Sequence, residues 1–364
     1  MKKVAIVTLY GNDNYGNKLQ NYALQVTIEK LNFEVLTLKN INNCKNNFEF
    51  LISKLLFNIK YIIKRLIPKY RYTCLRYNAF IKFNKQYLKY SNKNVYIMNK
   101  PTNFYKNCYY CIGSDQVWNP YASSNLTFFL GKYFPHDLTF SYAASFGVNQ
   151  FSEAQTKLYS EYLPKIKNIS VRETMAKKIV NQITDRNDVD VLIDPTLLLE
   201  KTEWVKIEKC VNKAKNQKYI LNYFLGNLSD ERRMVIEKIA KENDCVIINL
   251  LDRNSEYYAT GPSEFLYLEE NAFLICTDSF HSCVFAFIFD RPFMVFDRED
   301  SNENMSSRIE NLLEKFELSD RHYNDNAKEI NVDHDYSKGY KILEIERKKT
   351  SKFLKRVLNV EDSD

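Results

Sequence analysis

The chain has 364 residues, which is more than one ordinary hydrophobic core supports and predicts two domains. Its 45% apolar and 27% charged residues are typical of a globular protein and exclude a disordered chain. The net charge of +7 is local, because residues 50–114 contain thirteen Lys and Arg and no Asp or Glu. Such a basic stretch indicates an anionic partner.

No stretch reaches the roughly 18–20 uninterrupted apolar residues that a membrane span needs. The apolar run 4–9 is shorter than that of a signal peptide and leads into a polar loop, so we expect a buried strand in a cytoplasmic protein. The eight cysteines are scattered, several of them in apolar runs, as is typical of reduced thiols. Cys108 and Cys111 have CxxC spacing, but no second pair completes a zinc site, so we predict structural cysteines and no metal.

The first third of the chain alternates strand and helix patterns. Residues 4–9 predict a strand, the polar loop 11–17 follows, 19–26 have helical spacing, and 33–38 predict a second strand. A strand, a crossover helix and a strand form the unit of a parallel sheet. Residues 48–90 predict a long basic helical region that is interrupted at Pro68.

Polar or small residues follow each of the next predicted strands, 109–112, 138–144, 169–171 and 189–193. In open parallel sheets, ligands bind just beyond such carboxyl ends. The residues at these ends are Gly113-Ser114-Asp115-Gln116, Ser145-Phe146-Gly147, Arg172 and Asp194-Pro195-Thr196. We interpret the last of them as a structural strand exit.

A second alternation begins near residue 218. It predicts strands at 219–224, 245–250, 273–277 and 292–296, and helices at 230–242, 263–271, 282–289, 306–316 and 336–358. We therefore predict an α/β protein with two Rossmann-like domains that face a cleft. The predicted parts are residues 1–205 with a basic helical insertion at 48–106, residues 206–335, and a C-terminal helix over 336–364 that packs back on the first domain.

Familiar nucleotide motifs are missing from the chain. The loop 11–18 superficially resembles a P-loop, but the Gly-Lys-Ser/Thr ending is absent, and no GxGxxG follows any strand. ATP and NAD are therefore disfavoured, and we predict no cofactor. The loop still precedes a helix whose free N–H groups make an anion or hydroxyl site. An ordinary turn between strand and helix explains it equally well.

Two cationic or proton-carrying side chains are candidates for the cleft. His281 follows the predicted strand 273–277 and begins an apolar helix, where it can face an anion or pass a proton. The alternative is a capping or core histidine. Arg172 ends the strand 169–171, and its guanidinium matches carboxylate and phosphate geometry. The alternative is a surface ion pair with Glu173.

Asp115 and Gln116 end another strand and precede Trp118. An acid beside an amide and an aromatic ring suits sugar hydroxyls. The alternative is a helix cap formed by Ser114 or Asp115.

Together these segments resemble the polysaccharide pyruvyl transferase family. The matching stretches run in order at 15–24, 113–119, 141–147, 170–173, 194–196 and 277–281, with 291–293 and 307–309 also fitting. The resemblance implies a glycosyltransferase-B-like pair of domains, with the acceptor side in 1–205 and the donor side in 206–335. It also implies transfer of the enolpyruvyl group of phosphoenolpyruvate onto two hydroxyls of a sugar in a cell-surface glycan precursor, which forms a pyruvate ketal.

The resemblance also implies roles for particular residues. Arg172 and His281 would converge on phosphoenolpyruvate, with His281 as general acid toward the departing phosphate and Asp115 as general base. Other donor-side residues are Ser279, Ser282 and Arg308, and the acceptor-side residues are Asn17, Lys18, Gln20, Asp115 and Gln116. Some family members have Arg where this chain has Ser279, so a cation must come from elsewhere, such as Arg308 or Lys18.

The acceptor in such systems is often carried on a polyprenyl diphosphate lipid, so the basic stretch 48–106 is expected to face the anionic inner surface of the cell membrane. The alternative is a solvated helix that packs on its own domain. A nucleotide-sugar glycosyltransferase of the same fold is the nearest rival function. A nucleic-acid-binding module is the least favoured, because no known module is present, and we predict no nucleic-acid partner.

Overall fold

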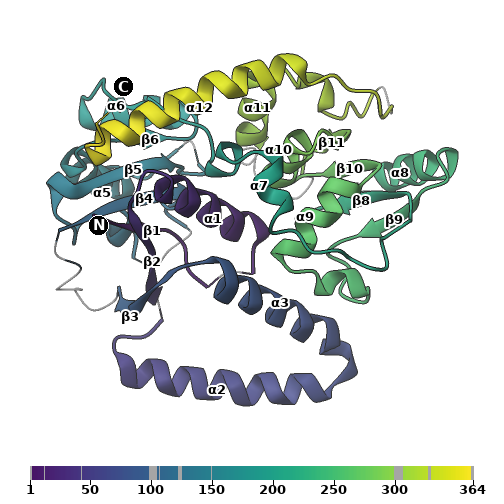
Figure 1. Cartoon of the computed structure of the whole chain (residues 1–364), viewed down its shortest axis with the longest axis horizontal. Coiled ribbons are helices and arrows are strands. Elements are labelled where there is room, and N and C mark those ends of the chain that lie inside the picture. The colour runs from purple at the N-terminus through teal and green to yellow at the C-terminus, as the bar shows by residue number, and fades with distance from the viewer. Residues whose placement is uncertain are drawn as a thin grey trace. The chain divides into compact units, whose positions relative to one another are not determined.

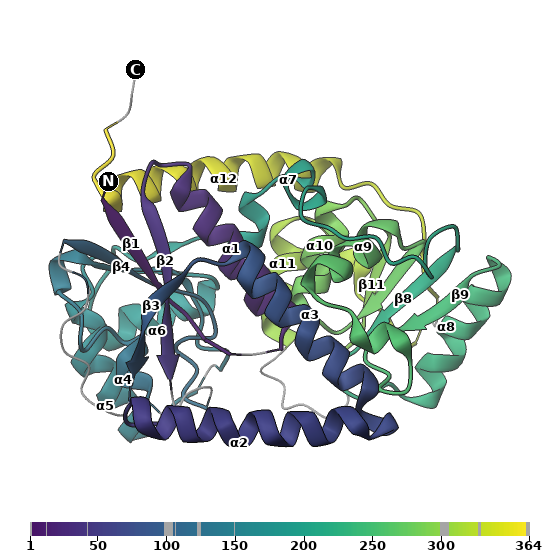
Figure 2. The same ribbon diagram turned by 60° about the horizontal axis from the view of Figure 1, so that its bottom comes forward.

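The computed structural model describes residues 2–11, 13–41, 43–97, 105, 107–121, 125–148, 150–298, 306–326 and 329–361. The chain forms two compact units, and each is assembled from separate segments. Unit 1 contains residues 1–62, 84–198 and 345–364, and unit 2 contains residues 63–83 and 199–344. Figures 1 and 2 show that both units are α/β folds.

Unit 1 is built, within its described residues, on a seven-stranded sheet in which neighbouring strands are parallel. The strand order is β3-β2-β1-β4-β5-β6-β7. The chain starts mid-sheet, adds β2 and β3 on one side of β1 and adds β4 to β7 on the other, so the switch point lies between β1 and β4. Open parallel sheets usually bind their ligands at such a switch point. The strands are β1 (Lys3–Val7), β2 (Glu34–Ile41), β3 (Tyr90–Tyr96), β4 (Cys108–Asp115), β5 (Thr139–Ala144), β6 (Ser170–Val171) and β7 (Asp190–Val191).

Helices cover both faces of this sheet. Leu24 and Ile28 of α1 and Leu354 of α12 share one core with Val4 and Ile6 of β1. A second core on the other face receives side chains from three further helices. The helices that contribute to unit 1 are α1 (Tyr15–Glu29), α4 (Leu126–Phe129), α5 (Glu153–Tyr162), α6 (Thr174–Thr184) and the last part of α12 (Ser337–Leu358), with short 3₁₀ turns at His136–Leu138, Leu163–Lys165 and Pro195–Leu198.

Unit 2 contains a smaller parallel sheet with the described order β11-β10-β8-β9. Its switch point lies between β8 and β10, because β9 and β10 flank β8 on opposite sides. The strands are β8 (Tyr219–Tyr223), β9 (Val246–Asn249), β10 (Leu274–Thr277) and β11 (Phe293–Val295). The helices are most of α3 (Arg71–Tyr87), α7 (Lys201–Val205), α8 (Asp230–Glu242), α9 (Pro262–Asn271), α10 (Phe280–Ile288), α11 (Ser306–Lys315) and the start of α12, with 3₁₀ turns at Pro68–Tyr70, Glu256–Ala259 and Ser319–Arg321.

One helix, α2 (Asn47–Leu66), contributes no buried residue to any core. It appears as the long helix in the blue-purple part of the chain in Figure 1. None of the helices that the structure describes is both long enough and apolar enough to cross a membrane.

The prediction of an α/β chain with two parallel sheets is confirmed. The units differ from the predicted domains in two places: the chain leaves unit 1 at 198 rather than near 205, and residues 63–83 of the basic insertion group with unit 2. Residues 345–364 group with unit 1, in agreement with a C-terminal helix that packs back on the first domain. Helix breaking at Pro68 is also confirmed, since α2 ends at Leu66 and α3 begins at Arg71. Of the cations in the acid-free stretch, Lys100 and Lys106 lie outside the described residues.

Candidate functional site

At the switch point of unit 1, hydrogen bonds link α1, the end of β1 and β4. Gln20 of α1 donates from Nε2 to Oγ1 of Thr8, 3.3 Å away, just after β1. Thr8 in turn donates from Oγ1 to the carbonyl oxygen of Ser114 in β4, at 3.2 Å. All three side chains are buried. Gln20, which was predicted on the acceptor side, therefore takes part in a hydrogen-bonded link between α1, β1 and β4.

Asp115 ends β4 at this switch point and is half-buried. Its φ of 74° lies in the left-handed region, which Asp tolerates better than most residues. Nδ2 of Asn17, in the first turn of α1, lies 3.5 Å from Oδ2 of Asp115. Asn14 fixes that turn, because its side chain caps the helix by accepting from the backbone N–H of Asn17 at 3.0 Å. The structure thus brings Asn17 and Asp115 together.

Lys18 is buried in the same first turn of α1, with 2% of its surface exposed. Its ammonium lies 5.9 Å from the ring centre of Tyr10, and it forms no hydrogen bond or ion pair with the residues described here. Burial lowers the pKa of Lys18 to about 8, against a smaller raising effect from Asp13. A buried amine with a pKa near neutrality can hold an anion or exchange a proton.

Arg172 follows β6 and is buried among carboxylates. It donates from Nη1 to Oδ2 of Asp194 at 2.8 Å and from Nε to Oε1 of Glu173 at 3.1 Å. Burial acts to lower the pKa of Arg172, but the carboxylates of Glu173, Asp194 and Asp115 outweigh it and raise the pKa. The surface ion pair that was the alternative for Arg172 is therefore replaced by a buried cluster.

Sequence reasoning missed the role of Asp194. Besides its ion pair with Arg172, Asp194 accepts hydrogen bonds at Oδ1 from the backbone N–H and the hydroxyl of Thr196, at 3.0 and 2.7 Å. The expectation for Trp118 is wrong, because its ring is fully buried and its Nε1 donates to the carbonyl of Phe129 at 2.9 Å. Trp118 is a core residue and presents no face to a sugar.

Backbone packing holds the ends of β4 and β5 close together. Gly113 has a φ of 124°, and a Cβ at this position would lie 2.2 Å from the carbonyl oxygen of Tyr142. Only glycine fits there. Gln116, next to Asp115, accepts at Oε1 from Nδ2 of Asn119 at 3.3 Å. The close strand ends keep Asp115 and Gln116 next to the end of β5.

In unit 2 the switch point carries the turn from β10 to α10. Asp278 ties this turn to the end of β8, because it accepts from the backbone N–H groups of Leu225 and Gly226 at 2.7 and 2.8 Å. The same carboxylate accepts from Nε of Arg298 at 2.9 Å. Arg298 comes three residues after β11, and its position places a guanidinium beside the turn that contains Ser279.

The predicted donor residues lie on this turn. Ser279 is the N-cap of α10, and His281 is half-buried in its first turn. The hydroxyl of Ser282 donates to Oε1 of Glu269 at 2.6 Å in the core, so only its backbone N–H remains for a ligand. Burial raises the pKa of Glu269 well above its ordinary value, against a lowering effect from Ser282. Arg308 lies half-buried near the start of α11.

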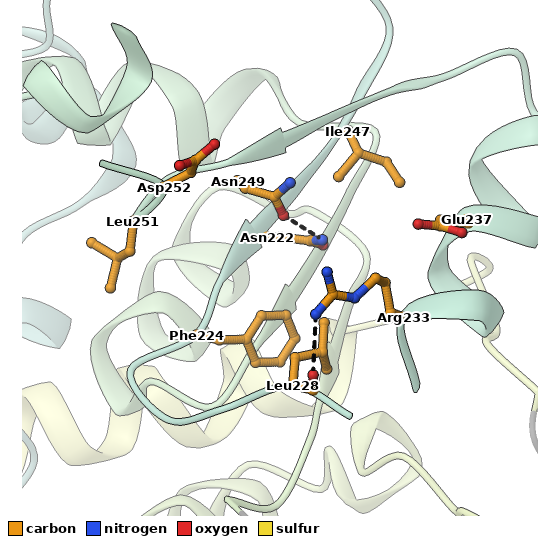
Figure 3. Close-up of a pocket in the computed structure, with 9 residues that line it drawn as sticks. All are labelled: Asn222, Phe224, Leu228, Arg233, Glu237, Ile247, Asn249, Leu251 and Asp252. Carbon is orange, nitrogen blue, oxygen red and sulfur yellow. Dashed lines mark hydrogen bonds between the residues drawn. The ribbon is translucent and has the colours of Figure 1, made fainter. Parts of the chain in front are cut away.

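A cavity of about 450 Å³ lies along β8, β9 and α8 in unit 2 (Figure 3). Its lining combines apolar side chains with an amide pair, in which Asn222 donates from Nδ2 to Oδ1 of Asn249 at 3.0 Å. Oδ1 of Asn222 is buried and has no hydrogen-bond partner among the residues described. The lining residues are Asn222, Phe224, Leu228, Arg233, Glu237, Ile247, Asn249, Leu251 and Asp252, and none of them was predicted as a site residue.

Each unit therefore offers a different chemistry at its switch point. Unit 1 presents carboxylates, an amide and a buried amine, which suit hydroxyl groups and proton transfer. Unit 2 presents a histidine, a guanidinium and the start of a helix, which suit an anion. Among the described residues, no group of three or more His, Cys, Asp and Glu side chains is placed to hold a metal ion.

Comparisons with known proteins place the chain more specifically. The model of the polysaccharide pyruvyl transferase family matches residues 14–301. No curated protein matches the chain. Among solved structures, UDP-N-acetylglucosamine 2-epimerase from Rickettsia bellii aligns with 99% of this chain and 98% of its own, at 10% identity and a TM-score of 0.45. UDP-GlcNAc 2-epimerase from Methanocaldococcus jannaschii aligns with 95% of this chain and 93% of its own, at 16% identity and a TM-score of 0.42.

Proposed function

Because the chain belongs to the polysaccharide pyruvyl transferase family, we propose that it transfers the enolpyruvyl group of phosphoenolpyruvate to two hydroxyls of one sugar. One observation carries the proposal. The family match spans 14–301 and so includes Asp115 at the switch point of unit 1, Arg172 after β6 of the same sheet, and His281 at the switch point of unit 2. The two sets of side chains supply the acid, base and cations that this reaction needs.

The reaction balances without an added oxidant or reductant. Protonation of the methylene carbon of phosphoenolpyruvate makes its neighbouring carbon electrophilic, and the first sugar hydroxyl attacks that carbon. The carbon–oxygen bond to phosphate then breaks, and the second hydroxyl attacks to close the ketal. One hydroxyl proton ends on the new methyl group and the other on phosphate. The protein has to move two protons and stabilise the charge on the phosphate.

In this reaction the residues of unit 1 act mainly on the acceptor and the residues of unit 2 act on the phosphate. Asp115 takes the proton of the attacking hydroxyl, and Asn17, Lys18, Gln20 and Gln116 line or position the acceptor. His281 protonates the departing phosphate, and the backbone N–H groups that follow it bind the phosphate oxygens. Arg172 acts on the carboxylate of the donor while Glu173 and Asp194 hold its guanidinium in place.

Arg298 supplies the cation that Ser279 cannot. Its guanidinium donates to Asp278, which directly precedes Ser279, so a cation stands at the turn although the arginine found there in other members is missing. This position supports Arg298 over Arg308 or Lys18 as the replacement.

The acceptor class follows from the family, whose members modify polysaccharides. We propose a sugar of a cell-surface glycan precursor on a lipid carrier, modified in the cytoplasm. All eight cysteines are free thiols, which supports a reducing compartment.

Phosphate release from phosphoenolpyruvate, measured with candidate lipid-linked sugars, tests the function. We expect release only when both substrates are present, with a product that carries a new carboxylate by mass spectrometry. His281→Ala should abolish release, whereas His136→Ala, at an exposed position of unit 1, should not. Full activity of His281→Ala would refute the donor site.

A nucleotide-sugar glycosyltransferase is the second candidate, and the cavity in Figure 3 is the observation that favours it. Phe224 offers a flat apolar surface there, and the buried Oδ1 of Asn222 offers an acceptor for a base or sugar. Calorimetric titration with nucleotide sugars, against the wild type and Asn222→Leu, tests this function. Binding of phosphoenolpyruvate but not of nucleotide sugars would exclude it.

A further inference from the structure

Most of the apolar side chains of α2 are exposed. Its start is held by β3, because Tyr96 donates from its hydroxyl to Oδ1 of Asn47 at 2.5 Å and its ring lies 6.3 Å from that of Phe50. Phe50 and Tyr61 are half-buried, and every other residue of the helix is exposed. With 3.6 residues per turn, Phe50, Phe57 and Tyr61 share one side of the helix.

The opposite side of α2 is broad and apolar. Its side chains recur every three or four residues along the whole helix, and they are between 44% and 79% exposed: Phe48, Leu51, Ile52, Leu55, Leu56, Ile59, Ile62, Ile63 and Leu66. A helix of a globular protein normally buries such a face against a core. A continuous exposed apolar patch of this kind marks a surface that another partner covers.

The positive charge of α2 favours an anionic partner for this face. The helix carries Lys54, Lys60, Lys64 and Arg65 against the single acid Glu49. Packing against a second copy would bring these cations together, whereas an anionic bilayer surface neutralises them. The apolar arc is also wider than the narrow seam of a two-stranded coiled coil.

We propose that α2 is an interfacial helix that lies in the plane of an anionic membrane. Leu55, Ile59 and Ile62 enter the boundary between headgroups and acyl chains, while Lys60 and Arg65 extend to the headgroups on either side. The helix is about 30 Å long at 1.5 Å per residue. Its charges keep it in the interface, in agreement with the lack of a spanning helix among the described residues. This partner goes beyond the transfer reaction and does not depend on it.

Flotation with lipid vesicles tests the proposal. We expect the wild type to float with vesicles of phosphatidylcholine and phosphatidylglycerol, and not with phosphatidylcholine alone. Replacing Leu55, Ile59 and Ile62 by Ser should abolish flotation. Lys60→Glu with Arg65→Glu should weaken binding at least tenfold while leaving the apolar face intact. The matched control replaces three exposed apolar residues elsewhere by Ser: Leu75, Met234 and Ile345.

A tryptophan pair tests the orientation of the helix. Both native tryptophans are fully buried, so an added one on α2 reports separately. Leu55→Trp should be quenched by lipids brominated in the acyl chains, and Phe57→Trp, on the opposite side, much less. Equal quenching of the two variants, or flotation of the Leu55/Ile59/Ile62 variant, would overturn the proposal.

Light scattering distinguishes membrane binding from the alternative, which is packing of α2 against a second copy of the chain. A wild type that forms dimers, does not float, and becomes monomeric when Leu55, Ile59 and Ile62 are replaced would assign this face to a second copy of the chain and refute membrane binding. A monomer that floats supports the proposal. Because the altered side chains are exposed, the thermal unfolding temperature of each variant should match the wild type.

Discussion

Arg172 and Asp194 are joined by a 2.8 Å hydrogen bond between Nη1 and Oδ2, and both side chains are almost completely buried. Glu173 contacts the same guanidinium through Oε1 and also accepts from the hydroxyl of Ser145 at 2.8 Å. This arrangement fixes one cation between two carboxylates at the ends of adjacent strands. The contribution of this cluster to stability can be measured by unfolding, and its contribution to the transfer reaction can be measured by kinetics.

Asp194→Asn should destabilise the protein, because it removes the carboxylate charge that lies 2.8 Å from Nη1 of the buried Arg172. Removing one partner of a buried ion pair costs up to about 3–5 kcal/mol of unfolding free energy. Denaturant unfolding measures this value. Asp188→Asn is the control, since Asp188 is 67% exposed in its pair with Arg186 and should cost less than about 1 kcal/mol. Equal stabilities of the two variants would contradict the buried cluster.

Lys18→Met should stabilise the protein at pH 7 and lower its activity. The pKa of Lys18 is about 8 in the folded chain and 10.5 ordinarily, so the unfolded chain binds more protons between these values. Stability therefore rises with pH from 8 to 10.5, and below pH 8 the charge costs on the order of 3 kcal/mol.

Calorimetric unfolding at pH 7 and pH 10 checks the sign of this effect. The stability gained by Lys18→Met should be largest at pH 7 and shrink at pH 10. Lys30→Met, at an exposed position beyond α1, should show no such difference. A Lys18→Met variant that is less stable at pH 7 would show that the ammonium has a favourable partner.

Asp115→Asn should lower kcat by about 10²–10⁴, the range for loss of a general base. The fold should survive, because Asp115 is half-buried and the hydrogen bond of its side chain with Asn17 is long, at 3.5 Å. Steady-state kinetics and thermal unfolding of the same preparation measure the two effects. Asp137→Asn, at an exposed position of unit 1, is the matched control. Normal kcat in the Asp115 variant would transfer the role of base to another group.

Arg298→Met should weaken phosphoenolpyruvate binding about 10–100-fold, since a hydrogen bond to a charged group contributes about 1.5–3 kcal/mol. Asp278 keeps its two backbone N–H donors in this variant, so the turn should remain folded. Isothermal titration measures the affinity, with Arg253→Met at an exposed site as the control. Unchanged binding would point to Arg308 instead.

Glu269→Gln should remove a pH dependence of stability. The pKa of Glu269 is raised in the folded chain, so its contribution is complete below its ordinary pKa and is lost as pH rises. An amide keeps the hydrogen bond from Ser282 without this loss. The thermal unfolding temperature of the variant should exceed that of the wild type at pH 8 and approach it at pH 5. An equal gain at both pH values would argue against a buried neutral carboxyl group.

Much of the fold was predictable because strands in parallel sheets are continuous apolar runs that end in recognisable turns. Residues 138–144 and 273–277, for example, predict β5 and β10 almost to the residue. The strand β3 was not predicted, because Tyr90–Tyr96 is largely polar and pairs only at the edge of the sheet. The family resemblance is confirmed by the match over 14–301.

The site was predictable where a polar residue directly follows a strand, as Asp115 and Arg172 do. Asp194 was interpreted as structural because an Asp before Pro is common in strand exits, and its partner is 22 residues away in sequence. Arg298 was missed for the same reason, since its contact with Asp278 spans 20 residues. Trp118 was assigned to a sugar because local sequence does not show that the turn after β4 directs its ring into the core.

The separate segments of each unit also set an order of events during synthesis. The backbone passes between the units at 62/63, 83/84, 198/199 and 344/345. Phe353, Leu354, Val357 and Leu358 of α12 belong to the core that α1 and β1 begin, although every other element of unit 1 leaves the ribosome earlier. The part of this face that α12 covers therefore stays exposed until unit 2 has been translated, and a nascent chain stalled before α12 would present it to chaperones.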